Sequence, residues 1–122
     1  MATPPDPFFL PRAKQAVIPA AKLRDYALNP EHATGRHKAR MFAAELGIHQ
    51  KHWEYLSDQI AQRVTSTSVS RIDVDAYGTR YEVVVSIDGL NGATVPVVSA
   101  WFVPHEPPDN PPRLVSTYVY RP

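Results

Sequence analysis

The sequence predicts an α+β fold in which about three N-terminal helices pack on a four-stranded antiparallel β-meander. Two observations lead to this prediction. The spacing of apolar residues follows the 3.6-residue period of helices up to about residue 64 and then changes to the two-residue period of strands. Short segments connect the successive strands, which favours pairing between neighbours along the chain. Helices followed by strands are typical of α+β domains.

The length and composition predict one domain without covalent cross-links. A chain of 122 residues fits a single core, and we divide it into a proline-rich arm at 1–14 and a folded domain at 15–122. The absence of cysteine excludes disulfide frameworks and thiolate sites. The N-terminal residues lack the basic and apolar regions of a signal peptide, and no apolar run spans a bilayer. We therefore expect a cytoplasmic protein with no membrane contact.

The first and third helices are expected at 19–28 and at roughly 50–63. Pro19 suits the first position of a helix, and Asn29-Pro30 ends the first one. The third helix has an apolar side at helical spacing. That side consists of Trp53, Leu56, Ile60 and Val64.

The second helix is expected to begin after Thr34, which is a suitable N-cap, with Gly35 just inside. Gly47 suits the position that ends it. One face of this helix is apolar at the spacing i, i+3, i+4 and i+7, and it consists of Ala39, Phe42, Ala43 and Leu46.

Four strands follow. The stretch SRIDVDAYGTRYEVVVSID at 70–88 gives two strands around a turn at Tyr77-Gly78, and Asn91-Gly92 marks the next turn. The third strand is ATVPVVSAWFVP, where Pro96 indicates an edge position or a bulge near its start. The loop HEPPDNPP precedes the fourth strand, RLVSTYVYR.

Alternation along the strands predicts which face of the sheet is free. On the second strand, Tyr81, Val83, Val85 and Ile87 share the face expected to meet the helices. On the fourth strand, one face is expected to carry Leu114, Ser116, Tyr118 and Tyr120. A row of hydroxyl groups on a half-exposed face is a reasonable ligand platform, and it is also ordinary for any exposed antiparallel face.

The stretch GRHKAR at 35–40 breaks a local rule. The first turn of a helix carries the positive end of the helix dipole, where basic side chains are unfavourable. An anion bound at this end would remove the conflict. Charge is also uneven along the chain, with nine Lys/Arg against five Asp/Glu in residues 12–63 and four against six in residues 64–122. This asymmetry fits an anionic ligand at the first half, and solvated helix faces would give the same pattern.

Several chemistries have no motif in this sequence. There is no HExxH or EF-hand loop, and the pair His49 and His52 fits exposed positions better than a metal site. No Gly-rich phosphate loop or GxSxG elbow is present. We therefore predict no metal and no cofactor.

Among the chemistries considered, metal-free cleavage of a phosphodiester is the one that the residues of this sequence can support. Cutting RNA this way requires acid and base groups for the 2′-hydroxyl and the leaving oxygen, and cations for the phosphate. The candidate catalytic residues are Lys38, His37, Arg80, Ser116 and Tyr118. Arg36 and Arg40 are candidates for phosphate binding. On the helical wheel Lys38 and Arg40 flank the buried face and His37 points nearly opposite, so Lys38 ranks above His37. These groups are expected to line one shared cleft, with Lys38 within reach of Arg80, Ser116 or Tyr118.

The stretch AVIPAAKLRDYALNPEHATGRHKARMFAAELGI, with YGTRY, AWFV and PRLVSTYV further on, resembles a small bacterial domain family of unassigned function. Such domains occur free-standing and as the C-terminal tips of polymorphic toxins. They are similar in element order to the barnase–EndoU–colicin–RelE-like fold, a resemblance that implies metal-independent ribonuclease activity. It also implies RNA as substrate and a small acidic antitoxin or immunity protein as partner.

A second hypothesis stays open beside the ribonuclease-like toxin. The proline-rich arm, the HEPPDNPP loop and aromatic residues such as Trp101, Phe102, Tyr118 and Tyr120 could serve a non-catalytic protein-interaction module. Of these aromatic residues, Trp101 is expected in the core rather than in a contact. Catalytic turnover on RNA separates the two.

Overall fold

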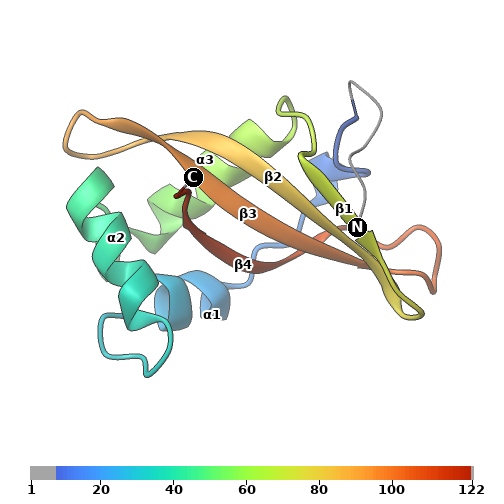
Figure 1. Ribbon diagram of the computed structural model, residues 1–122, viewed down its shortest axis with the longest axis horizontal. Helices are drawn as coiled ribbons and strands as arrows, with labels where there is room; N and C mark the ends of the chain where they lie inside the picture. The colour runs from blue at the N-terminus through green and yellow to red at the C-terminus, as the bar shows by residue number, and fades with distance from the viewer. Residues whose placement is uncertain (1–7, 122) are drawn as a thin grey trace.

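The computed structural model describes residues 8–121. Its sheet has the order β1-β2-β3-β4 with antiparallel neighbours, so the predicted α+β fold with a β-meander is confirmed. Helix α3 covers one face of the sheet, and α2 stands at the end of the sheet beside β4 (Figure 1). The elements are η1 (Ala13–Gln15), α1 (Ala20–Lys22), η2 (Leu23–Ala27), α2 (Arg36–Leu46), η3 (Gln50–His52), α3 (Trp53–Val64), β1 (Arg71–Val74), β2 (Gly78–Asp88), β3 (Thr94–Pro104) and β4 (Arg113–Val119).

The helices form close to the predicted boundaries. The first consists of the short α1 and then η2, a π-helical turn in which the Leu28 amide donates to the Leu23 carbonyl at 2.8 Å. Helix α2 begins at Arg36, with Gly35 rather than Thr34 in the N-cap position. Gly47 ends α2 at a φ of 65°, a left-handed conformation that glycine adopts without a steric cost.

The expectation that Pro96 marks an edge strand or a nearby bulge is wrong. β3 lies between β2 and β4, and the irregularity lies further on, between Ala100 and Trp101. Proline is tolerated at this position because the β4 ladder ends where Val97 pairs with Val119. On the side of β4, the Pro96 carbonyl accepts a hydrogen bond from the Tyr120 amide at 2.9 Å. Proline has no N–H group, and none is needed there.

The irregularity changes the faces of β4. Trp101 pairs with Leu114 and Ala100 pairs with Ser116, so Val115 is an extra residue on β4. Leu114 is therefore turned to the core and is fully buried, whereas the sequence pattern placed it in the hydroxyl row. Beyond the bulge, alternation returns and Ser116 is half-buried on the face opposite the core. A bulge cannot be read from a period of two, which explains the error.

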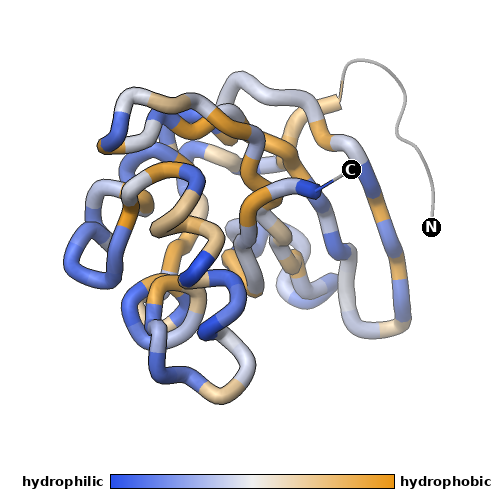
Figure 2. The backbone as a smooth tube through the Cα atoms, turned by 60° about the vertical axis from the view of Figure 1, so that its left-hand side comes forward, coloured by the Kyte–Doolittle hydropathy of each residue, from blue (hydrophilic) through white to orange (hydrophobic). Residues whose placement is uncertain are grey.

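The core lies between the sheet and the helices. Figure 2 shows hydrophobic segments gathered where helices and sheet meet and hydrophilic segments in the outer loops. The predicted inner face of β2 is confirmed for its fully buried positions Val83, Val85 and Ile87. Buried polar groups are paired, since Trp101 Nε1 donates to Ser99 Oγ at 2.9 Å and Ser99 Oγ donates to the Val83 carbonyl at 2.9 Å. These bonds avoid the cost of an unpaired buried polar group. None of the described helices has the length and apolar run that crossing a bilayer requires.

The described end of the N-terminal segment packs against the domain. Leu10 is buried, and the Phe8 carbonyl accepts from the Val69 amide at 2.7 Å. The Phe8 ring stacks on Tyr81 with ring centroids 6.2 Å apart. The proline-rich arm predicted at 1–14 thus lies along the domain from residue 8 onward, and residues 1–7 lie outside the described residues.

Candidate functional site

Lys38 and Tyr26 form a polar pair at the N-terminal end of α2. Lys38 Nζ donates to Tyr26 Oη at 2.5 Å and lies 4.5 Å from the centroid of the same ring. On its other side, Lys38 Nζ lies 5.8 Å from the ring centroid of Tyr118 in β4. A cation between two aromatic rings is held electrostatically as well as by its hydrogen bond. The Lys38 charge is therefore fixed in position between two elements.

The backbone explains how Tyr26 comes beside α2. Gly35 lies so close to η2 that a Cβ atom there would be 2.2 Å from the Tyr26 carbonyl oxygen. Only glycine permits this approach. The wide turn of η2 buries Leu23 and Ala27 while Tyr26 stays half-exposed on the side of β4.

The loop between η2 and α2 is ordered by hydrogen bonds that Asn29 and His32 accept from backbone amides. Asn29 Oδ1 accepts from the Glu31 amide at 3.0 Å. His32 Nδ1 accepts from the Thr34 amide at 3.1 Å and from the Gly35 amide at 3.0 Å. Because Nδ1 faces two N–H donors, the neutral ring carries its proton on Nε2. The His32 ring also meets the Tyr26 ring edge-on, with centroids 4.8 Å apart.

The surroundings of Tyr26 change its acidity. The hydrogen bond from Lys38 is the main cause that lowers the pKa of the Tyr26 phenol, and burial acts in the opposite direction. The charge of Lys38, a hydrogen bond with Thr34 and the charge of Lys22 lower this pKa further. Tyr26 is thus a stronger acid than an ordinary tyrosine, whose pKa is about 10.

Two adjoining hollows lie along β4 on either side of this pair, and we name them together the β4 groove. The first, about 460 Å³, is lined by Ala21, Lys22, Asp25, Tyr26, His32, Val115 and Ser116. The second, about 300 Å³, is lined by His37, Lys38, Met41, Tyr118 and Val119. Tyr26 lines the first hollow and Lys38 lines the second, so their hydrogen bond lies at the boundary between the two.

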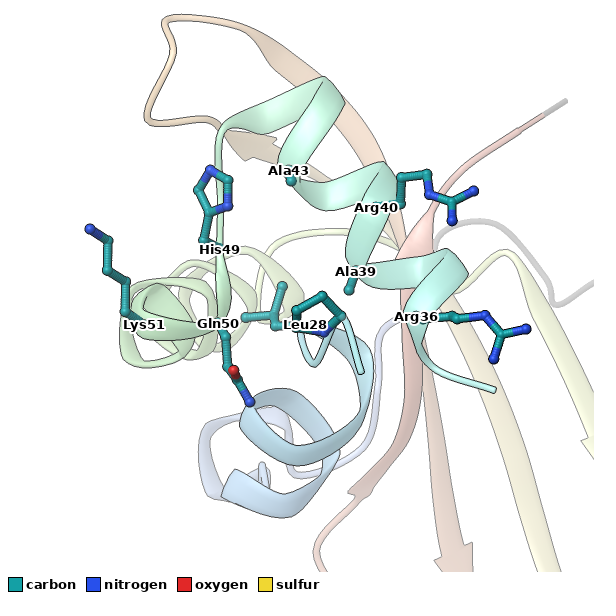
Figure 3. A pocket seen from close by; sticks show the side chains of 9 residues that line it. Leu28, Arg36, Ala39, Arg40, Ala43, His49, Gln50 and Lys51 are labelled. Carbon is teal, nitrogen blue, oxygen red and sulfur yellow. The ribbon is translucent and has the colours of Figure 1, made fainter. Parts of the chain in front are cut away.

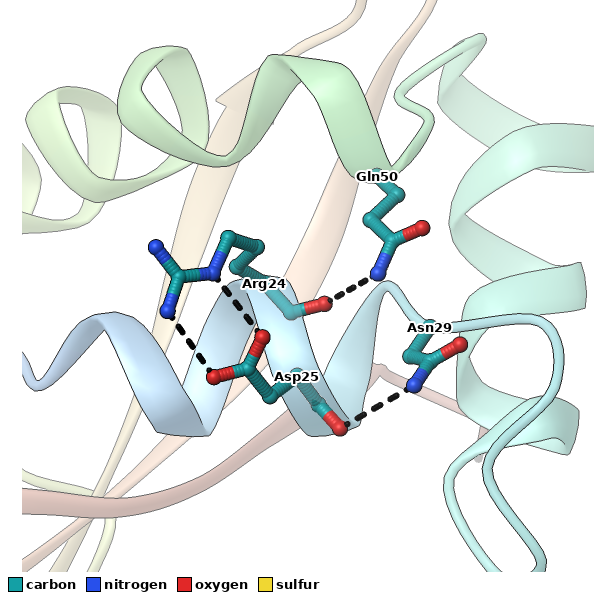
Figure 4. Close-up of polar contacts among 4 residues, drawn as sticks. All are labelled: Arg24, Asp25, Asn29 and Gln50. Atoms are coloured by element: carbon teal, nitrogen blue, oxygen red, sulfur yellow. Dashed lines mark hydrogen bonds and ion pairs between the residues drawn. The ribbon is translucent and has the colours of Figure 1, made fainter.

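The carboxylate in the groove is paired. Arg24 donates to Asp25 Oδ1 at 2.8 Å and to Asp25 Oδ2 at 3.0 Å (Figure 4). This pairing lowers the pKa of Asp25. The same turn is tied to η3, because Gln50 Nε2 donates to the Arg24 carbonyl at 2.7 Å. A negative charge that is paired with its neighbour repels an incoming anion less.

The structure brings four of the five candidate catalytic residues to the β4 groove. Lys38 and Tyr118 are in ring contact, Ser116 lines the first hollow, and the exposed His37 lines the second. The helical wheel ranks Lys38 above His37. In the structure, Lys38 lies between the rings of Tyr26 and Tyr118, whereas His37 is exposed.

Arg80 is not part of the groove. It lies opposite Asp73 in β1 and Phe102 in β3, and it lines a separate hollow of about 200 Å³. Val84 in β2 and Tyr118 in β4 both pair with Val98 in β3, so these three residues lie side by side across the sheet. Arg80 is four residues away from Val84 along β2, and β2 is two strands away from β4. Arg80 is therefore separated from Tyr118 by roughly 13 Å along the strands and by about 10 Å across the sheet. The expectation that Arg80 shares a cleft with Lys38 is therefore not met.

Arg36 and Arg40 lie on the opposite flank of α2. They line the edge of a pocket of about 490 Å³ between α2 and η3. Ala39 and Ala43 lie on the side of α2 that faces the pocket (Figure 3). The candidate phosphate ligands therefore do not meet the candidate catalytic residues. We name this cavity the α2–η3 pocket.

The two histidines considered for a metal site are near each other. The rings of His49 and His52 have centroids 5.8 Å apart, and His52 Nδ1 accepts from the His49 amide at 2.9 Å. Within residues 8–121, no three His, Asp or Glu side chains gather as metal ligands do.

Sequence reasoning missed Tyr26 and His32. Neither residue is among the candidate site residues that the sequence predicts. The signal for them lies in the stretch KLRDYALNPEH at 22–32, part of the segment that resembles the small bacterial domain family, and this stretch contains both residues. Their partner Lys38 lies in the next helix, and no period along the chain reveals a contact across a loop.

The family described as a domain of unknown function (DUF6883) matches residues 9–121, and the chain belongs to this family. One chain of a solved structure, described as a contact-dependent growth inhibition toxin–immunity protein complex from Klebsiella pneumoniae 342, has a similar fold. The TM-score is 0.67 at 15% identity, and the match covers 85% of this chain and 99% of that chain. No curated protein matches the chain.

Proposed function

We propose that this domain is a metal-independent, ribonuclease-like toxin that cleaves RNA phosphodiesters in the β4 groove. The observation that carries the proposal is the Lys38–Tyr26 pair, a fixed cation bonded to a phenol whose pKa it lowers. Such a pair combines a charge for the phosphate with a group that can exchange a proton. The similar fold in a structure described as a toxin–immunity protein complex supports a toxin-related role.

In the proposed reaction, Lys38 stabilises the negative charge on the non-bridging phosphate oxygens. Its ammonium group is held between Tyr26 and Tyr118, so little reorganisation is needed when the charge develops. His32 contributes a second donor, because its Nδ1 is occupied by backbone amides and the proton resides on Nε2.

The proton transfers are assigned to His37 and Tyr26. His37 takes the proton from the 2′-hydroxyl while the 2′-oxygen forms a bond to phosphorus. The bond from phosphorus to the 5′-oxygen breaks, and the Tyr26 phenol gives its proton to that oxygen. The Tyr26 phenolate is then stabilised by the Lys38 hydrogen bond. The products are a 2′,3′-cyclic phosphate and a 5′-hydroxyl end.

Ser116 is proposed to position the ribose. Ser116 lines the first hollow and lies on the same face of β4 as Tyr118. The Tyr118 ring keeps Lys38 in place. Arg80 has no role in this reaction.

The test is degradation of total cellular RNA by purified protein in buffer with EDTA. Wild-type protein should produce fragments with 5′-hydroxyl ends, and Lys38→Ala or Tyr26→Phe should remove this activity. Arg80→Ala is the matched control, because it removes a cation outside the groove and should keep full activity. Wild-type protein without activity, or with activity that EDTA abolishes, would refute the proposal.

We further propose that the protein acts in the cytoplasm and is neutralised by a small acidic antitoxin or immunity protein that covers the β4 groove. Lys22, Lys38 and His37 around the groove are complementary to an acidic surface. Binding of such a partner should block RNA cleavage and should weaken when Lys38 is replaced. A partner that binds without affecting cleavage would show that it covers another face.

The alternative is a non-catalytic interaction module. One observation favours it, namely the exposed apolar side chains Val74 and Tyr77 at the tip of the β1–β2 hairpin, which are 63% and 81% exposed. If Val74→Ser and Tyr77→Ser abolish binding to a co-purified partner while wild-type protein shows no turnover on RNA, this alternative replaces the ribonuclease proposal.

A further inference from the structure

We propose that the α2–η3 pocket binds the sugar–phosphate backbone of RNA at a second position, outside the β4 groove. The inference rests on the proposed function and adds a requirement for an extended RNA substrate. Arg36 and Arg40 come from α2, and His49 and Lys51 come from the segment that follows it. Figure 3 shows His49 and Lys51 across the pocket from α2, and it shows Arg36 and Arg40 at the outer edge of the pocket with their charged ends extending away from it.

The chemistry of the pocket fits a nucleotide. Its volume of about 490 Å³ lies in the range of small-molecule sites. The rim has three permanent cations, and its described lining residues include no carboxylate. Between the cations lie small and apolar side chains, Ala39, Ala43 and Leu28, against which a ribose or base can pack.

The cations at the edge of the pocket can meet phosphates of a strand that crosses its mouth. Arg36, Arg40 and Lys51 are all exposed, so their charges are available to a ligand. Arg36 Nη1 donates to the Ala33 carbonyl at 2.6 Å, which fixes one side of that guanidinium and leaves its other donors open. Arginine forks match phosphate oxygens in geometry.

The pocket and the groove share one helix. Ala39 and Phe42 are buried between them, with Lys38 on one flank and Arg40 on the other. A helix with its side chains is about 10–12 Å wide. One RNA strand that passes the N-terminal end of α2 can therefore contact both sites a few nucleotides apart. Substrates too short to span this width would use the groove alone.

RNA fits the pocket better than an acidic protein does. Carboxylate side chains would meet the exposed rim, but they would leave the apolar floor at Ala39 and Ala43 uncovered. A nucleotide supplies both the negative charge and a flat apolar ring. An acidic protein remains an outcome of the test.

The test uses two RNA lengths and the variant Arg40→Gln/Lys51→Gln. Affinity for a single-stranded 2′-O-methyl RNA, which cannot be cleaved through its 2′-oxygen, should fall by about 10- to 30-fold, and the slope of log affinity against log salt should decrease by about one to two. Cleavage of long RNA should fall in parallel. Cleavage of a dinucleoside phosphate should stay at the wild-type rate.

The control is Lys14→Gln/Arg113→Gln, which removes the same charge from exposed positions outside both sites and should leave affinity for the 2′-O-methyl RNA unchanged. Unchanged binding and cleavage of long RNA by Arg40→Gln/Lys51→Gln would overturn the inference while the ribonuclease proposal stands. An equal loss of binding to poly-glutamate would also overturn it, because the pocket would then be a general anion surface. Wild-type protein that binds the RNA but cleaves neither substrate would refute the ribonuclease proposal instead.

Discussion

On one flank of α2, Lys38 is half-buried and held by Tyr26 and Tyr118, whereas on the other flank Arg40 and Lys51 are exposed around an open pocket. The difference distinguishes two uses of a cation. A charge that is fixed beside a phenol can change the acidity of that phenol and can meet a developing charge without reorganisation. Exposed charges on long side chains contribute affinity that salt screens. This difference supports the proposal that the first flank carries the chemistry and that the second flank binds substrate.

The largest effect on activity is expected from Lys38→Met, which keeps the stem of the side chain and removes its charge. Loss of the cation and of the acidified Tyr26 should lower the rate of RNA cleavage by about 10²- to 10⁴-fold. Fold stability should change little, and thermal unfolding checks this. A variant that keeps its cleavage rate would show that the fixed cation has no part in catalysis.

The next largest effect is expected from Gly35→Ala, which tests whether the close approach of α2 to η2 builds the groove. The new Cβ would meet the Tyr26 carbonyl oxygen at 2.2 Å, so the start of α2 must move away. Overpacking of this kind costs about 1–3 kcal/mol of unfolding free energy. Denaturant unfolding and RNA cleavage should both reveal the change.

Gly92→Ala is the control, because no atom lies within 4 Å of its added Cβ, although its φ of 88° adds strain to that turn. Gly92→Ala should therefore lower stability without lowering cleavage relative to the folded fraction.

The acidity of Tyr26 provides a spectroscopic test. Of the six tyrosines, one should ionise at lower pH in wild-type protein than in Lys38→Met, as measured by tyrosinate absorbance. In the window between the lowered pKa and about 10, the unfolded chain binds more protons at this group, so its contribution to stability increases with pH. That contribution is complete above the ordinary pKa and disappears as the pH falls through the lowered one. Identical titrations of the two proteins would contradict the pairing.

The smallest effect concerns the hydroxyl row of β4. Lys38 contacts the ring of Tyr118, and Tyr118→Phe keeps this ring. The variant should therefore change the cleavage rate by less than about twofold. Removal of a proton-transfer group typically lowers a rate by about 10²-fold or more. Tyr118→Leu removes the ring and should have a clear effect. A large loss in Tyr118→Phe would instead assign the hydroxyl to the reaction.

The sequence contained most of the fold and part of the site. The change of period from 3.6 to 2 predicted the helices and the meander, and the helical wheel predicted that Lys38 and Arg40 flank the buried face of α2. The bulge at Val115 and the position of Pro96 inside the sheet depend on pairing between strands, which a local pattern does not contain. Tyr26 meets Lys38 only because Gly35 allows two elements to approach, and that contact is tertiary.

The central claim is tested most directly by single-turnover cleavage, in EDTA, of an oligonucleotide with one ribose among deoxyriboses. The account predicts one cut, after the single ribose, that leaves a 2′,3′-cyclic phosphate and a 5′-hydroxyl, and it predicts no such cut by Lys38→Met. An intact oligonucleotide, or cuts at deoxyribose positions, would contradict cleavage through the 2′-oxygen in the β4 groove.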